Sequence, residues 1–274
     1  MAGKTNSLLR LWHLLSLDAP TVATLWTWFI ARVNHIPLAA TSLLAMAAAV
    51  WMLYAADRLL DGQGTQSDAL EARHHFHYRH RKSFLIGIAV ASILLALLLP
   101  RIPMEAIRVY LVLGGLVFGY FIVIHATSSA HRLPKEIAVG VCFAAAVFIP
   151  TVARQPNLRA VLLAPALLFA ALCSLNCLFI YAWEHPPGAA QQRPHALTSA
   201  ALRHLSLLAS AVGITSAGLT FLHRHSLWPI SAAIALSAFA LLELHRQRMR
   251  YDVLTLRAAA DLVLLTPVIF AGFL

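Results

Sequence analysis

The chain alternates long apolar runs with short polar or basic breaks. A helix needs about 20 mainly apolar residues to cross roughly 30 Å of hydrocarbon. Reading the breaks from proline, glycine and clustered charges, we predict nine transmembrane helices. They cover residues 19–34, 37–57, 83–100, 105–125, 136–153, 158–183, 203–222, 227–244 and 255–273. The pattern therefore predicts an all-α, polytopic membrane protein.

Few residues lie outside these spans. Residues 8–17 (LLRLWHLLSL) are too short to span and lack a small-residue cleavage site, so we interpret 1–18 as an interfacial N-terminal segment. The other longer connections, 61–82 and 184–202, are predicted to be cytoplasmic loops. The whole chain, 1–274, is thus expected to form a single transmembrane domain.

Composition agrees with this interpretation. The chain is 60% hydrophobic and 12% charged, with a mean hydropathy of +0.74, whereas about a quarter of a soluble domain is charged. The net charge of +10 comes from short basic clusters between apolar runs, which favours topology signals and lipid headgroups over nucleic acid. The chain has three cysteines, Cys142, Cys173 and Cys177. All three lie in apolar segments, so we interpret them as small buried hydrophobic residues that form no disulfide framework.

The basic residues also predict an orientation. The N-terminal segment, Arg58 and the connections after every second span hold 15 of the 21 lysines and arginines. Positive charge concentrates on the cytoplasmic side, so the N-terminus is predicted inside and the C-terminus outside. Compactness and the lack of a targeting segment suggest a bacterial inner membrane.

The stretch YAADRLLDG (54–62) carries Asp57 and Asp61, four residues apart at the end of the second span. Positions i and i+4 share a helix face, so both carboxylates can reach one ligand. Hard cations such as Mg²⁺ bind oxygen ligands and are commonly held by one or two carboxylates plus substrate phosphates. An equally weighted alternative is a solvated helix end at which Arg58 marks the interface.

Two more segments on the predicted cytoplasmic side carry suitable chemistry. HRLPKEIAVG (131–140) brings Arg132 and Lys135, and LNCLFIYAWEH (175–185) brings Asn176, Tyr181 and Glu184. Carboxylates that hold a metal, with basic groups that neutralise a leaving diphosphate, would suit a magnesium diphosphate. The simpler alternatives are a positive-inside loop, an interhelical polar contact, an aromatic belt and a solvated carboxylate.

Taken together, the nine spans, the DxxxD motif, the basic loop and the acidic end of span 6 resemble the UbiA-type intramembrane prenyltransferase superfamily over nearly the whole chain. The resemblance implies an enzyme that uses Mg²⁺ to ionise an isoprenyl diphosphate and transfers the prenyl group to an aromatic or lipid-like acceptor. By position, Asp57 and Asp61 match the first metal motif, Lys135 and Arg132 match the diphosphate contact, and Glu184 stands in the second metal motif.

The sequence departs from the family pattern at two places. Leu53 stands where the first motif usually has asparagine, and Glu184 is the single acid of the second motif. Two alternatives therefore stay open, which are other isoprenoid chemistry such as cyclisation, and a non-catalytic binder of polyprenyl lipids. Asn176 and Tyr181 are candidate substrate-binding residues.

Further polar residues are candidates of lower priority. The loop RHHFHYRHRK (73–82) is interpreted mainly as a basic interfacial segment, in which Arg73 is a candidate diphosphate contact. Asp18, two residues before Pro20, is predicted to be the N-cap of the first span. Asp261 lies one turn after Arg257, and an i,i+4 pair would lower the cost of its charge in the membrane.

Overall fold

The computed structural model describes residues 2–61, 76, 79–127, 134–185, 194–222 and 227–273. Within these residues the chain is helical and contains no strand. The helices are α1 (Ala2–Leu14), α2 (Asp18–Val33), α3 (Ala40–Asp61), α5 (Arg81–Leu98), α6 (Met104–Thr127), α7 (Lys135–Arg154), α8 (Arg159–Glu184), α9 (Ala196–Arg203), α10 (Leu205–Leu222), α11 (Trp228–Arg246), α12 (Val253–Leu262) and α13 (Pro267–Phe270). Short 3₁₀ turns extend or link several of them.

A helix occupies each of the nine predicted ranges. Seven helices in the described residues are long and apolar enough to cross a membrane, and a bent pair raises this number to eight. The all-helical, polytopic class is therefore supported, whereas the count of nine crossings stays a prediction. The bent pair is α1 and α2, which meet at 89°. That angle suits the predicted interfacial N-terminal helix.

The centre of the bundle is built around α2, whose sequence is apolar on nearly every side. Trp26 is fully buried, its ring centroid lies 4.4 Å from that of Phe169 in α8, and its indole Nε1 donates to the Leu264 carbonyl at 2.7 Å. A buried indole N–H requires such a partner. This contact joins α2 to the C-terminal segment although 238 residues separate the two positions.

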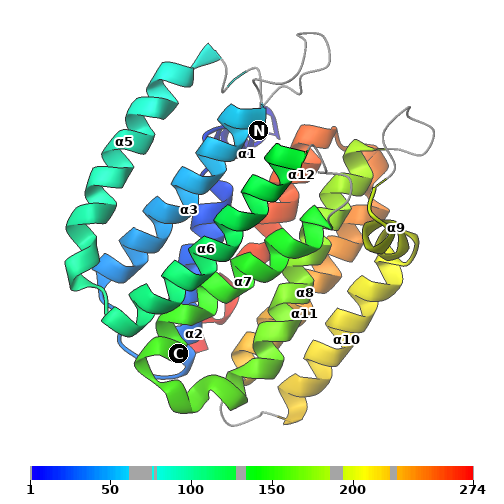
Figure 1. Cartoon of the computed structure of the whole chain (residues 1–274). Helices are drawn as coiled ribbons and strands as arrows, with labels where there is room; N and C mark the ends of the chain where they lie inside the picture. Colours follow the sequence, from blue (N-terminus) through cyan, green and yellow to red (C-terminus); the bar gives the residue numbers. More distant parts are fainter. Residues whose placement is uncertain are drawn as a thin grey trace.

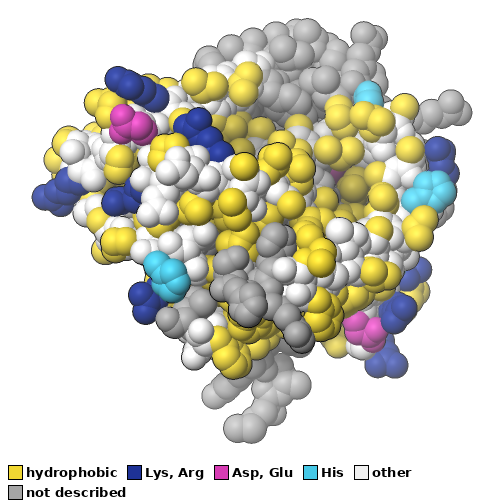
Figure 2. Space-filling view, turned by 90° about the horizontal axis from the view of Figure 1, so that it is seen from below, with side chains coloured by type: hydrophobic (Ala, Val, Ile, Leu, Met, Phe, Trp, Pro, Cys, Tyr) yellow, Lys and Arg dark blue, Asp and Glu magenta, His cyan; other side chains and the backbone are white. Residues whose placement is uncertain are grey.

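The outer helices present apolar side chains outward. Exposed large hydrophobic residues recur along α5, α6 and α10, among them Ile86, Leu97, Leu111, Leu116 and Leu207. Figure 2 views the bundle from the end opposite the N-terminus, where the charged side chains lie mainly toward the margins and hydrophobic side chains lie between them. An apolar exterior of this extent is typical of contact with lipid.

The helices run up and down, so that alternate connections gather at the same end (Figure 1). The two termini lie toward opposite ends of the bundle, and α3 and α8 finish at the end that carries the N-terminus. Figure 1 thus places the end of the DxxxD helix and the acidic end of α8 on one side of the molecule.

Candidate active site

A cluster of buried charges lies where α1 turns into α2, and we call it the corner cluster (His13, Asp18, Arg58 and Asp261). The His13 Nδ1 is 2.5 Å from Asp18 Oδ2, and the Arg58 guanidinium donates to the same oxygen at 3.2 Å. His13, Asp18 and Arg58 are each at most 5% exposed. Buried charges are stable only when paired and hydrogen-bonded, which explains why opposite charges meet here.

This cluster corrects two predictions. Asp18 is not the N-cap of the first span, because α2 begins at Asp18 itself and the N-cap position is Leu17. The Asp18 carboxylate instead accepts from the Ala19 amide at 2.9 Å and from its charged neighbours. The alternative of a solvated helix end is also wrong for Arg58, because its side chain points into the bundle and is buried.

Asp261 joins the cluster from α12. Its Oδ2 lies 3.9 Å from His13 Nδ1, and its Oδ1 accepts a hydrogen bond from Asn176 Nδ2 of α8 at 2.9 Å. Asn176, a predicted substrate-binding residue, is thus buried in an interhelical contact. The Asn176 amide nitrogen faces Asp261, and Asn176 Oδ1 is left without a hydrogen-bond partner.

An ion pair also joins α8 and α12. Arg257 of α12 pairs with Glu184 at the end of α8, and their side chains are 11% and 10% exposed. Glu184, the predicted ligand of the second metal motif, is therefore engaged by a cation of the protein itself. The sequence assigned Arg257 to Asp261, whereas the structure brings it to Glu184.

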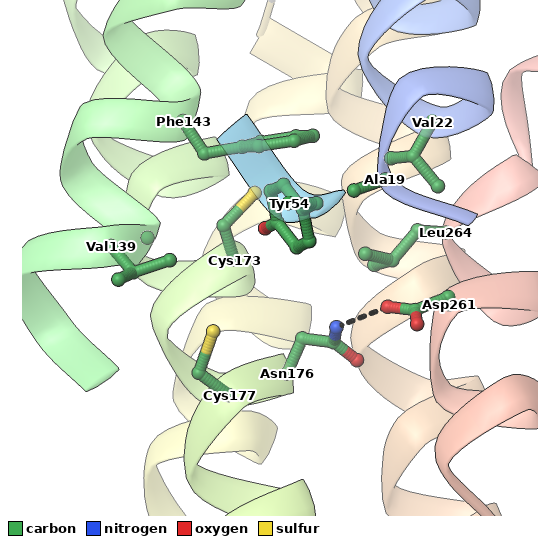
Figure 3. A pocket seen from close by; sticks show the side chains of 11 residues that line it. Ala19, Val22, Tyr54, Val139, Phe143, Cys173, Asn176, Cys177, Asp261 and Leu264 are labelled. Carbon is green, nitrogen blue, oxygen red and sulfur yellow. Dashed lines mark hydrogen bonds between the residues drawn. The ribbon is translucent and has the colours of Figure 1, made fainter. Parts of the chain in front are cut away.

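A small pocket lies beside Asn176 and Asp261 (Figure 3). Its volume is about 30 Å³, which is small for a site that holds an organic ligand. Its walls come from α2, α3, α7, α8 and α12, and its polar lining includes Tyr54, Cys173 and Cys177. Tyr54 precedes Asp57 by three residues on α3, so the pocket lies about one helical turn deeper than the first motif.

The beginning of α7 packs tightly on α8 near this pocket. Gly140 is buried against Ser174, and a Cβ at Gly140 would lie 2.6 Å from Ser174 Cα. The Ser174 hydroxyl donates to the Ile137 carbonyl at 3.3 Å, and Glu136 accepts from Thr198 of α9 at 3.0 Å. These contacts place the half-buried Lys135, the first residue of α7, beside α8 at the level of the pocket.

The remaining predicted residues divide into two groups. Asp57 is half-buried on the last turn of α3, and Tyr181 is half-buried on α8, where its ring stacks on His185 with centroids 4.2 Å apart. Asp61 ends α3, and its side chain lies outside the described residues, as do Arg73 and Arg132.

Two sets of side chains are candidates for a metal ion. His13, Asp18 and Asp261 offer ligand atoms within 4.8 Å of one another. The Arg58 guanidinium already pairs with Asp18, so part of the negative charge of this trio is balanced without a metal ion. Positions 57 and 61 are one helical turn apart near the end of α3, and carboxylate ligands fit Mg²⁺.

Sequence reasoning missed His13 and the inward role of Arg58. The sequence feature that could have identified them is charge balance, because each acid within an apolar run needs a partner of opposite sign. Comparison with family models, curated proteins and solved structures finds no match to this chain.

Proposed function

We propose that the protein is an intramembrane prenyltransferase that ionises an isoprenyl diphosphate with the help of Mg²⁺ and transfers the prenyl group to an aromatic or lipid-like acceptor. The observation that carries the proposal is the convergence of three elements at one end of the bundle. The half-buried Asp57 lies near the end of α3, the half-buried Lys135 begins α7, and the same two helices line the small pocket through Tyr54 and through Val139, Gly140 and Phe143.

In this proposal the metal is held by Asp57 and Asp61, whose carboxylates are ligands and not bases. The ion would neutralise the diphosphate and so stabilise the charge that develops on it as the allylic C–O bond breaks. Lys135 at the N-terminus of α7 would add a positive charge where the helix dipole also favours an anion. Glu184 has no part in this ligand set, because Arg257 already engages it.

The apolar residues that line the pocket favour a hydrophobic substrate. The pocket walls include Phe143, Val139, Leu264 and Ala19 beside the polar lining (Figure 3). At about 30 Å³ the pocket is too small to enclose a prenyl chain. Binding therefore requires the chain to extend between helices toward lipid, or the bundle to open.

The test is release of diphosphate by the purified full-length protein in detergent, from farnesyl, geranylgeranyl and longer diphosphates, with Mg²⁺ or EDTA. We expect Mg²⁺-dependent release that Asp57→Asn abolishes. Glu243→Gln is the matched control, since Glu243 is an exposed carboxylate near the end of α11 that pairs with Arg246.

Each other outcome selects an alternative. Tight binding of the diphosphate without release would overturn the enzymatic proposal and favour a polyprenyl-lipid binder. Release that yields a cyclic product without an acceptor would replace transfer by cyclisation. Full activity in Asp57→Asn would remove the first motif from the mechanism.

A further inference from the structure

Arg58 lies between the two aspartates of the first motif in sequence, and its side chain points into the bundle. It is 5% exposed. Its Nη1 donates to the His13 carbonyl at 2.6 Å and to Ser16 Oγ at 3.0 Å, and its Nη2 donates to Asp18 Oδ2 at 3.2 Å. One guanidinium thus connects the last turns of α3 to both ends of the α1–α2 corner.

Other buried contacts also hold the α1–α2 corner. Ser16 is fully buried and has a φ of 57°, a left-handed conformation that is uncommon for a residue other than glycine. Trp51, seven residues before Arg58 on α3, donates its indole N–H to the Leu15 carbonyl at 3.0 Å. Two side chains two turns apart on α3 therefore hold the same corner.

The anchor of Arg58 fixes the rotation of α3 at its end. Successive residues of an α-helix are turned by roughly 100°, so positions 57 and 61 both lie on the same flank of Arg58, roughly 60–100° around the axis. A buried, multiply bonded guanidinium cannot leave its acceptors without a large desolvation cost. While Arg58 stays in place, α3 cannot rotate about its axis, so the face that carries both aspartate positions keeps its direction relative to the bundle.

We propose that Arg58 is the positioning residue of the first motif, which orients Asp57 and Asp61 toward one metal–diphosphate by anchoring α3 to the α1–α2 corner. This inference rests on the proposed function. It goes beyond that function because it gives the interfacial helix α1 a part in the site. Loss of the Arg58 anchor would then change the orientation of the aspartates without altering either residue.

The experiment separates orientation of the site from general stability. The variants are Arg58→Met, Arg58→Lys and the matched control Trp51→Phe, which removes the other hydrogen bond to the corner but leaves Arg58 intact. For each, diphosphate release is measured against Mg²⁺ concentration, together with the apparent melting temperature. Mn²⁺ binding, followed by electron paramagnetic resonance, gives a second readout that requires no turnover.

We expect Arg58→Met to raise the half-saturating Mg²⁺ and Mn²⁺ concentrations about tenfold and to lower maximal release about 10- to 100-fold, since small misplacements of reacting groups have effects of this order. Arg58→Lys should restore part of the metal affinity, because it keeps the charge but not the fork geometry. Trp51→Phe should lower the melting temperature and leave metal dependence unchanged.

If Arg58→Met and Trp51→Phe lower stability alike and share a wild-type metal dependence, the positioning role is wrong while the proposed function stands. If the wild-type protein neither releases diphosphate nor binds Mn²⁺ through Asp57, the proposed function itself fails, and this inference fails with it. Mn²⁺ binding that Asp57→Asn removes and Arg58→Met weakens supports the inference even when no release is observed.

Discussion

Replacing Glu184 by glutamine is expected to destabilise the protein strongly, because it breaks the ion pair with Arg257 that joins α8 to α12. Both side chains are about nine-tenths buried. Removal of one partner from a buried pair typically costs about 3–5 kcal/mol, mostly because the other charge stays buried. We expect the lower end, about 3 kcal/mol, since Glu184 is the last residue of its helix.

The assay is thermal unfolding in detergent with a thiol-reactive dye. Cys173 is buried and free, so its modification reports opening of the bundle. For a chain of this size each kcal/mol corresponds to roughly 2–4 °C, and Glu184→Gln should therefore lower the apparent melting temperature by about 6–12 °C. The double variant Glu184→Gln/Arg257→Met removes both charges and should recover most of that loss.

The same variants decide between a structural and a metal-binding role for Glu184. The pairing predicts that Glu184→Gln leaves the half-saturating Mg²⁺ concentration of diphosphate release unchanged. A melting temperature within about 2 °C of the wild type, or a double variant no more stable than the sum of the two single losses, would refute this account of the pair. A shift in Mg²⁺ dependence without loss of stability would return Glu184 to the metal site.

Two further predictions test the surroundings of the site. Gly140→Ala should cost about 1–3 kcal/mol, because the added Cβ meets the backbone of Ser174, and the same unfolding assay measures it; a neutral result would show that α7 and α8 can separate freely. Burial would raise the pKa of Asp252, the N-cap of α12, but hydrogen bonds from Thr255 and the nearby Arg10 outweigh it and hold the pKa below its ordinary value of 3.8. The stability from this cap is therefore fully present above pH 3.8 and is lost as the pH falls through the lowered pKa, so Asp252→Ala should cost about 1 kcal/mol at neutral pH and progressively less in acid; a difference that does not change with pH would contradict the assignment.

The positions of the helices could be predicted from the sequence because length and apolarity are local properties. The predicted range 158–183 corresponds to α8, Arg159–Glu184, and 203–222 corresponds to α10, Leu205–Leu222. The interfacial position of residues 1–18 stays a prediction, although α1 meets α2 at 89° and residues 8–17 are too few to span. Whether every predicted span crosses the membrane depends on how each helix lies in the bilayer, and a local sequence pattern does not specify this.

The partners of the buried charges could not be predicted in the same way, because they depend on which helices meet. Asp18 is near Pro20 and so has the local signature of an N-cap, and Arg58 at the end of an apolar run has that of an interfacial anchor. An isolated helix could carry either signature, so neither signature identifies the partner of the charged side chain. What the sequence contains is a balance: acids and arginines occur together within apolar segments, where an unpaired charge is costly. Balance predicts that the charges pair, but only the arrangement of α1, α2, α3 and α12 decides that Arg58 meets Asp18 and that the first motif is thereby tied to the N-terminal corner.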